Sequence, residues 1–169
     1  MYTRMLIPMD ESKVAEQVLP CARSLAKTLA IPVELLEVID PEALNVLARP
    51  EEGRYIDTLV DEKTQTSKSY LQAIARSFAG VNVNCLVEHG KAEEIVIEKA
   101  AADKDTLIVM ATHGRSGIQR WLLGSVADKV LHGAPNHLLL IRARESGAVH
   151  GEAALTSIVA PLDGSPLAE

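Results

Sequence analysis

The chain has 169 residues, which is enough for one domain of ordinary size and too few for two full domains. Hydrophobic residues make up 47% of the sequence but aromatic residues only 3%, so the core must be aliphatic, which favours a buried parallel sheet covered by helices over an aromatic-rich sandwich. The formal net charge of −6 argues against nucleic-acid binding through a generally basic surface.

No segment of the sequence is typical of a membrane span or a secretory signal. Residues 1–10 lack a charged stretch followed by a long apolar run, and every apolar run is far shorter than the roughly 20 residues that cross a bilayer. We therefore expect a cytoplasmic protein without a membrane partner.

The first third of the chain predicts a strand, a helix and a second strand. Residues 5–9 (MLIPM) form a short apolar run that is typical of a buried strand. Ser12 can cap the helix that follows, in which apolar residues recur at helical spacing as far as Leu29. Pro20 lies inside this predicted helix and should bend it or loosen one turn. Residues 33–39 (VELLEVI) predict the second strand.

The middle of the chain is less regular. We interpret residues 40–62 as a long loop with a short helix, opening into a second helix that continues through Phe78. The expected inner face of that helix comprises Tyr70, Leu71, Ile74 and Phe78. Residues 79–80 (AG) should end it. Residues 81–87 (VNVNCLV) alternate apolar and polar side chains, as a half-buried or edge strand does.

The last third of the chain continues the alternation. Residues 93–101 predict a helix, and residues 105–111 (DTLIVMA) form the most hydrophobic strand. A helix over residues 125–132 and a last strand over residues 137–141 (HLLLI) follow a glycine-rich loop. Strands that alternate with helices, each strand nearly all apolar, indicate a parallel sheet with helices on both faces.

The alternation also predicts where a ligand would bind. Sheets of this kind bind ligands in the crevice beyond the carboxyl ends of their strands, where the strand order reverses. That rule points to Asp10, Val38 and the loop after Met110. The alternative role for Asp10 is to cap the first helix beside Ser12.

The cysteines and histidines show no pattern of a disulfide or a metal site. Cys21 and Cys85 stand among apolar neighbours, and neither has a partner at CxxC spacing, so we expect two buried free thiols. No metal-ligand spacing relates the histidines at His89, His132, His137 and His150.

The end of the chain repeats its beginning. Residues 4–16 (RMLIPMDESKVAE) and 157–169 (SIVAPLDGSPLAE) share proline, aspartate, serine, alanine and glutamate at the same offsets. We interpret the chain as one domain over residues 1–144, a linker over 145–156, and the start of a second, truncated domain over 157–169. The alternative is a tail that resembles the start by chance.

The loop over residues 111–126 (ATHGRSGIQRWLLGSV) has the features of a phosphate site. Gly114 and Gly117 allow backbone conformations and a close approach that a side chain would block. Gly124 and Ser125 open a helix whose first N–H groups have no internal partner and favour an anion. Arg115 either adds a cation or faces solvent. Neither GxxxxGK[ST] nor GxGxxG occurs here, and the alternative is a tight strand-to-helix connection that needs glycine.

The same residues resemble a known family. Residues 109–141 are similar to the C-terminal signature of universal stress proteins, whose ATP-binding members carry a G-x2-G-x9-G-[ST] motif. Gly114 and the pair Gly124 and Ser125 stand at the second and third elements of that motif, whereas Ala111 replaces its first glycine. Residues 6–10, 88–90 and 93–95 also resemble family segments, in order, so the resemblance covers roughly residues 2–143.

The resemblance implies a Rossmann-like, adenine nucleotide alpha hydrolase-like fold. This is a three-layer sandwich whose five-stranded parallel sheet has the order 3-2-1-4-5, with dimerisation through the last strand. It implies an ATP site, open also to ADP or AMP, in which Asp10 approaches the adenosine while Val38 and Met110 pack near the adenine. The residues expected at this site are Pro8, Asp10, Val38, Met110, Ala111, His113, Gly114, Arg115, Gly117, Gly124, Ser125 and Val126.

Three functions compete for such a chain. The first is an ATP-binding regulatory module of a stress response, with Mg²⁺ held mainly by phosphates and water and with slow or no hydrolysis, because no Walker lysine or positioned base is present. The second is a slow ATPase or a nucleotidyl-transferring enzyme, although His113 has no serine or cysteine nucleophile at a matching place. The third is a nucleotide-free, dimeric interaction protein, which Ala111 favours. Trp121 is expected to pack in the protein or to contact the dimer partner, and the alternative is that it stacks on a base.

Overall fold

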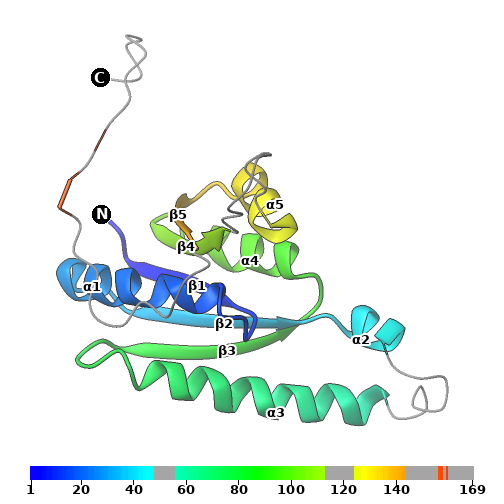
Figure 1. Ribbon diagram of the computed structural model, residues 1–169. Helices are drawn as coiled ribbons and strands as arrows, with labels where there is room; N and C mark the ends of the chain where they lie inside the picture. Colours follow the sequence, from blue (N-terminus) through cyan, green and yellow to red (C-terminus); the bar gives the residue numbers. More distant parts are fainter. Residues whose placement is uncertain (48–55, 113–123, 144–155, 158, 160–169) are drawn as a thin grey trace.

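The computed structural model describes residues 1–47, 56–112, 124–143, 156–157 and 159 (Figure 1). These residues form a parallel sheet of five strands in the order β3-β2-β1-β4-β5, which confirms the predicted α/β fold and its strand order. The strands are β1 (Arg4–Met9), β2 (Val33–Ile39), β3 (Val83–His89), β4 (Thr106–Thr112) and β5 (His137–Arg142). The helices are η1 (Ala15–Val18), α1 (Leu19–Leu29), α2 (Pro41–Leu47), α3 (Ile56–Ala75), α4 (Ala92–Ala101) and α5 (Ser125–Gly133).

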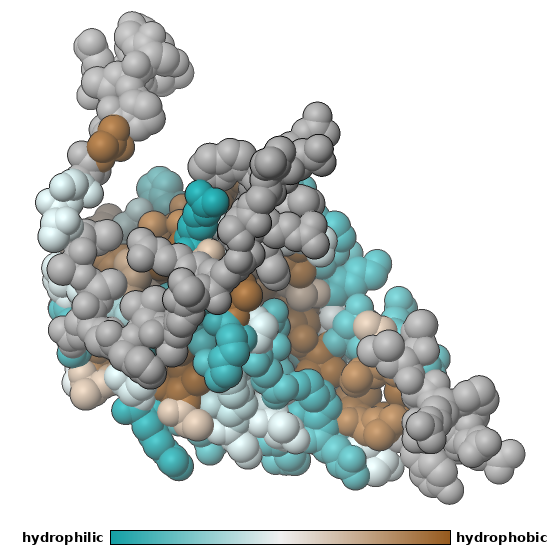
Figure 2. All heavy atoms as spheres, in the orientation of Figure 1, coloured by the Kyte–Doolittle hydropathy of each residue, from teal (hydrophilic) through white to brown (hydrophobic). Residues whose placement is uncertain are grey.

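The sheet is covered by helices on both faces, as the all-apolar strands require. Side chains alternate between the faces along each strand, so Met5 and Ile7 of β1 pack against α1 and α3, whereas Leu6 packs against α4 and α5. Figure 1 shows α3 on one side of the sheet and α4 with α5 on the other. In Figure 2 the outward side of α3 is largely hydrophilic or neutral, as expected of a surface helix.

The first helix differs from its prediction at Pro20. The structure has a short 3-10 turn, η1, followed by α1, and Pro20 stands in the first turn of α1 rather than inside a longer helix. Amide groups of a first turn have no intrahelical acceptor, so a proline there costs no hydrogen bond. Pro20 therefore marks where the α-helix begins. Ser12 does cap the segment, because its hydroxyl accepts a hydrogen bond from the Ala15 N–H at 3.0 Å.

Helix α3 begins earlier and ends earlier than predicted. It starts at Ile56, inside the segment expected to be a loop, and ends at Ala75, before Phe78. The charged residues of its first half, such as Glu62, are good helix formers, which a search for apolar spacing overlooks. Phe78 follows in a tight turn, where its N–H donates to the Ala75 carbonyl, and its side chain is still buried.

Strand β3 lies two residues later than predicted and forms one edge of the sheet. Its only neighbour in the sheet as described is β2, so the prediction of an edge strand is confirmed. Gly90 follows with φ +141°, a conformation that side chains disfavour, and its N–H donates to the Ile39 carbonyl at 2.9 Å. This turn sends the chain from β3 into α4.

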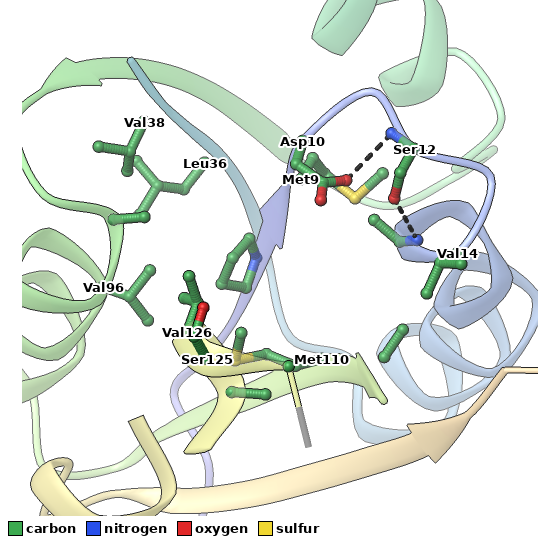
Figure 3. Close-up of a pocket in the computed structure, with 16 residues that line it drawn as sticks. Met9, Asp10, Ser12, Val14, Leu36, Val38, Val96, Met110, Ser125 and Val126 are labelled. Atoms are coloured by element: carbon green, nitrogen blue, oxygen red, sulfur yellow. Dashed lines mark hydrogen bonds between the residues drawn. The ribbon is translucent and has the colours of Figure 1, made fainter. Parts of the chain in front are cut away.

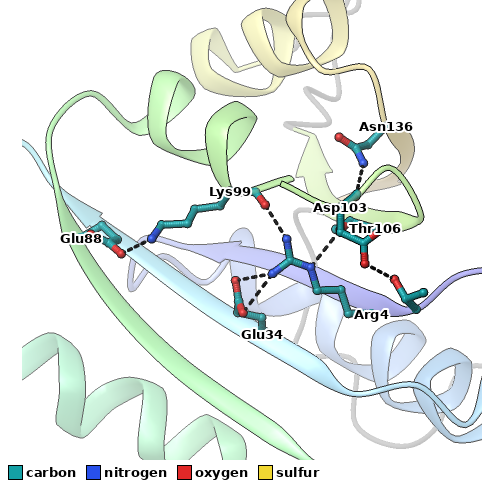
Figure 4. A network of polar contacts seen from close by, with 8 residues as sticks. Arg4, Glu34, Glu88, Lys99, Asp103, Thr106 and Asn136 are labelled. Carbon is teal, nitrogen blue, oxygen red and sulfur yellow. Dashed lines mark hydrogen bonds and ion pairs between the residues drawn. The ribbon is translucent and has the colours of Figure 1, made fainter. Parts of the chain in front are cut away.

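A polar network joins four strands and α4 near the start of β1 (Figure 4). The Arg4 guanidinium donates to Thr106 of β4 at 2.9 Å, to Glu34 of β2 at 3.2 Å and to the Lys99 carbonyl of α4. The Lys99 side chain pairs with Glu88 of β3. Because Arg4 is 22% and Glu34 13% exposed, their charges are paired close to the sheet rather than in open solvent.

The structure describes both cysteines, and neither forms a disulfide. Cys21 is buried as predicted, Cys85 is only partly buried, and burial raises the pKa of both thiols.

No helix within the described ranges is both long and apolar enough to cross a membrane. Residues 157–169 lie almost entirely outside the described residues, so the division into a domain, a linker and a second repeat remains a prediction.

Ala30 supplies a stability prediction. It is exposed and ends α1 in the left-handed conformation, with φ 52° and ψ 41°, which costs a residue with a Cβ about 1 kcal/mol. We expect Ala30→Gly to raise the free energy of unfolding in urea by about 0.5 kcal/mol. Ala102→Gly is the matched control, because Ala102 also caps a helix but has φ −59°, so glycine should destabilise there. Equal losses in both variants would contradict the prediction.

Candidate functional site

The candidate site lies where β1 and β4 separate. The two strands pair only at Arg4, Met5 and Leu6, and Leu6 opposite Ile108 is the last pair, although β1 continues to Met9 and β4 to Thr112. On its other side β1 stays paired with β2 as far as Met9. The sheet therefore opens at the carboxyl ends of its two central strands, which is where the strand order reverses.

Pro8 accounts for this opening. Backbone amides of a parallel strand point alternately to its two neighbours. The Met5 N–H donates to the Pro32 carbonyl on the β2 side at 2.9 Å, so position 8 faces β4. The next pair, Ile7 opposite Val109, would need a donor at position 8, and proline has none. The ladder between β1 and β4 consequently stops after Leu6.

The opening holds a crevice of about 260 Å³ (Figure 3). All predicted site residues in the described part of the chain line it, and these are Pro8, Asp10, Val38, Met110, Ala111, Gly124, Ser125 and Val126. The remaining predicted residues, His113, Gly114, Arg115 and Gly117, lie outside the described residues, as does Trp121. The structure thus brings the ends of β1, β2 and β4 to the start of α5.

The crevice also has walls that the sequence analysis did not identify. They are Met9, Ser12, Val14, Ala15, Leu36, Ala92, Val96 and Ala127. Leu36 could have been found, because it lies two residues before Val38 and so on the same face of β2. Ala92 and Val96 of α4 could not, since only the packing of α4 over β2 and β4 places them there.

One wall of the crevice is apolar. Leu36 and Val38 project from β2, Met110 from β4 and Val96 from α4, and Leu36, Val96 and Met110 are buried members of the core on that face of the sheet. Figure 3 shows Leu36, Val38 and Val96 on one side of the crevice and Asp10 with Ser12 on the other. This wall can accept a flat, apolar part of a ligand.

The opposite wall is a polar turn after β1. The Asp10 carboxylate accepts a hydrogen bond from the Ser12 N–H at 3.0 Å, and the Ser12 hydroxyl accepts from the Ala15 N–H at 3.0 Å. Asp10 therefore does not cap a helix, which was the alternative role weighed for it; it holds the turn and also lines the crevice. Asp10 is the only ionisable side chain among the described lining residues.

The floor of the crevice is the open amino end of α5. Gly124 is the N-cap residue of this nine-residue helix, and no side chain of the described residues caps its first N–H groups. Uncapped amides and the helix dipole make such an end favourable for an anion. Lys129 of α5 hydrogen-bonds Glu93 in the first turn of α4 and thereby holds the two helices together. That bond lowers the pKa of the Glu93 carboxyl below its ordinary value.

A cluster of acidic residues surrounds Tyr70 on the other side of the turn. Burial raises the pKa of the Tyr70 phenol far above its ordinary value of 10, and the nearby carboxylates of Glu16, Asp10, Glu37 and Glu11 raise it further. The hydroxyl is buried and has no hydrogen-bond partner among the described residues. Tyr70 therefore keeps its proton in the folded protein at a pH at which an exposed phenol would ionise.

Comparison with known proteins assigns this fold to one family. The sequence model of the universal stress protein family matches residues 1–142. Universal stress protein MJ0531 of Methanocaldococcus jannaschii is 30% identical over 144 residues, which cover 84% of this chain and 83% of that protein. The match to the family model extends over the whole sheet.

Solved structures agree with this assignment. The structure of MJ0577 from the same archaeon has a TM-score of 0.72 at 26% identity and covers 86% of this chain and 99% of its own. A universal stress protein from Archaeoglobus fulgidus, solved in complex with dAMP, has a TM-score of 0.56 at 19% identity, with 82% and 97% coverage. The similarity to the Archaeoglobus fulgidus structure shows that this chain and that protein share a fold.

Tyr70 generates a prediction about alkaline pH. A phenol with a raised pKa in the folded state contributes stability that is present below the unfolded pKa, near 10, and is lost as pH rises above it. We expect the unfolding free energy of the wild type to fall above pH 10 more steeply than that of Tyr70→Phe, by at most about 1.4 kcal/mol per pH unit. Urea unfolding at pH 9, 10 and 11 measures the two slopes, and identical slopes would refute the prediction.

Proposed function

Because the chain belongs to the universal stress protein family, we propose that its crevice binds ATP and that the domain is a nucleotide-responsive regulatory module of a stress response. The observation that carries the proposal is the amino end of α5, which no described side chain caps, in the same crevice as an apolar wall. A nucleotide needs both features, an apolar surface for its base and backbone donors for its phosphates. The dAMP-bound relative of the same fold supports an adenine base.

The described residues have distinct roles in this proposal. Val38 and Met110 pack against the adenine, and the Asp10 carboxylate accepts a hydrogen bond from the ribose. The phosphates lie at the N–H groups of the first turn of α5, beside Gly124 and the Ser125 hydroxyl. Gly114, Gly117, Arg115 and His113, with Pro8, Ala111 and Val126, complete the proposed site. ADP and AMP fit the same arrangement.

Mg²⁺ in this proposal enters with the nucleotide. A divalent cation prefers several oxygen ligands, and the described wall offers a single carboxylate, Asp10, which already accepts the Ser12 N–H. No group of three or more His, Cys, Asp or Glu side chains suited to a metal occurs in the described part of the chain. The residues present therefore fit a cation held by phosphates and water better than one held by the protein.

Slow hydrolysis is part of the proposal. Rapid phosphoryl transfer needs a positioned base and cations around the transferred group. The described walls hold one carboxylate, on the side opposite the expected adenine, and no lysine or arginine. In this proposal the protein responds to the binding of ATP and not to its hydrolysis.

A homodimer through β5 completes the proposed assembly. In the described structure β5 lies at the edge of the sheet and pairs only with β4. Its residues Leu138 to Ile141 are half-buried and apolar, so a second copy would both satisfy the open backbone groups and cover these side chains. Residues 157–169 would begin a second domain of the same family.

Ala111 favours one alternative, a nucleotide-free interaction protein. It lines the crevice where the family motif has its first glycine, and its methyl group occupies space near the expected phosphates. Nucleotide titration separates the two functions, since the alternative predicts a folded protein that binds no ATP even at millimolar concentration.

Gly124 allows a sharp test of the anion site. Aspartate and asparagine are both good N-cap residues, and Gly124 has φ −58°, so each should keep α5 intact. Gly124→Asp, however, places a carboxylate where the phosphates are expected. We expect it to weaken ATP binding in calorimetric titration at least about tenfold relative to Gly124→Asn, because a like charge next to an anion costs more than 1.4 kcal/mol. Equal affinities would exclude a phosphate at the start of α5.

The second test concerns turnover. With saturating ATP and Mg²⁺, we expect the purified protein to release phosphate at a rate on the order of 10⁻³ per second or slower, comparable to an unassisted nucleotide hydrolase. A phosphate-release assay measures it, with Gly124→Asp as the control for a contaminating ATPase. A rate above about 1 per second that the substitution abolishes would instead make the protein an enzyme.

A further inference from the structure

A buried carboxylate lies behind the crevice on β2. Glu37 is 3% exposed and points away from the crevice, toward α3. Its Oε1 atom accepts a hydrogen bond from the Ser67 hydroxyl at 2.8 Å and pairs with the Lys63 ammonium at 3.2 Å. Both partners come from α3, one turn apart. A charge this deep is retained only where it is paired, so Glu37 fixes α3 against the sheet at this point.

Lys63 makes a second ion pair, which reaches the turn after β1. Its ammonium lies 2.7 Å from Glu11. Partial burial alone would lower the pKa of Lys63, but its hydrogen bonds to Glu11 and Glu37 outweigh that effect and raise the pKa above the ordinary value. Lys63 therefore stays charged and bridges a rigid strand to the turn.

Glu11 stands between two residues that line the crevice. Asp10 and Ser12 face the crevice, whereas Glu11 does not line it and extends to α3. Its backbone is in the left-handed region, with φ 61°, which residues other than glycine adopt only when surrounding contacts hold them there. The ion pair with Lys63 is such a contact, and it acts from outside the crevice.

We propose that the ion pairs of Lys63 with Glu11 and Glu37 position the turn of Asp10 and Ser12, so that nucleotide in the crevice and the packing of α3 are coupled. The proposal rests on the proposed nucleotide site. Lys63, Glu11 and Glu37 touch no ligand in it and are positioning residues. Coupling of this kind is reciprocal, so nucleotide also holds α3 more firmly on the sheet, and a partner that binds the exposed side of α3 changes nucleotide affinity.

The test compares two substitutions that change the charge equally. Glu11→Gln removes the ion pair to α3 but leaves Lys63 paired with Glu37, so the fold is kept. Glu16→Gln is the control, because Glu16 lies in the same segment and pairs at 2.8 Å with the exposed Lys13, which does not belong to α3. Removing either carboxylate lowers the negative charge near an anionic ligand, which by itself strengthens binding. Lys63→Met is less suitable, since it leaves Glu37 buried without its cation.

Calorimetric titration with ATP and Mg²⁺ gives the first readout. We expect Glu11→Gln to weaken binding between about 2-fold and about 30-fold, and Glu16→Gln to leave it unchanged or slightly stronger. Equal affinities of the two variants would overturn the coupling while leaving the nucleotide site in place. A wild-type protein that binds no ATP would instead overturn the proposed function and the coupling with it.

Hydrogen exchange gives a second readout that a merely stabilising ion pair would not move. In the wild type and in Glu16→Gln, saturating ATP should slow amide exchange in α3 around Lys63, although this segment does not line the crevice. In Glu11→Gln at saturating ATP, that protection should be lost. If ATP slows amide exchange in α3 equally in the wild type and in both variants, the Glu11–Lys63 ion pair does not couple the turn to α3, and the proposal is wrong.

Discussion

The missing amide of Pro8 is the constraint on which the rest of the site depends. A parallel sheet buried between helices pairs its strands wherever donors and acceptors allow, because an unpaired backbone group in such a place is costly. Between β1 and β4 the pairing ends at Leu6. The side of β1 that faces β2 remains paired to Met9, so the strand is held along its length while its other side is unpaired. Most walls of this crevice are strand ends and helix starts held by the core, whereas the turn of Asp10 and Ser12 lies outside the regular elements.

The negatively charged group and the anion-attracting group at the opening belong to different structural elements. The only carboxylate of the described walls belongs to the turn after β1, and the uncapped helix end belongs to α5, across the crevice. An elongated ligand with an anionic end is therefore oriented, because its negative group is attracted by α5 and repelled by Asp10. The ion pair of Glu93 with Lys129 stabilises this arrangement, because it keeps α4 and α5 together on the same face of the sheet.

The other face of the sheet has a different character. There Leu71 and Ile74 of α3 pack into the larger core. Lys63 and Ser67 of the same helix, however, contact the carboxylate of Glu37, which is almost fully buried. Replacing a buried ion pair by apolar residues often leaves the stability of a protein unchanged or raises it, so stability alone does not require a charge at Glu37. The retained charge has a geometric consequence, because the same lysine reaches Glu11 and connects the turn at the crevice to a helix that does not itself line the crevice.

The sequence by itself determined the alternation of strands and helices, the edge position of β3 and, to within one residue, most strand ends, because apolar runs of this length pack between two layers of helices. The rule that ligands bind beyond the strand ends pointed to Asp10 and Val38, and the family resemblance added the strand order and residues such as Val126, all of which do line the crevice. Local patterns did not reveal that α3 begins at Ile56, because the apolar spacing of Ile56, Leu59 and Val60 is broken by polar residues before it resumes at Tyr70. Nor could they place Val96 in the crevice or pair Lys63 with Glu11, since these contacts join residues far apart in the chain and exist only once both helices are packed on the sheet.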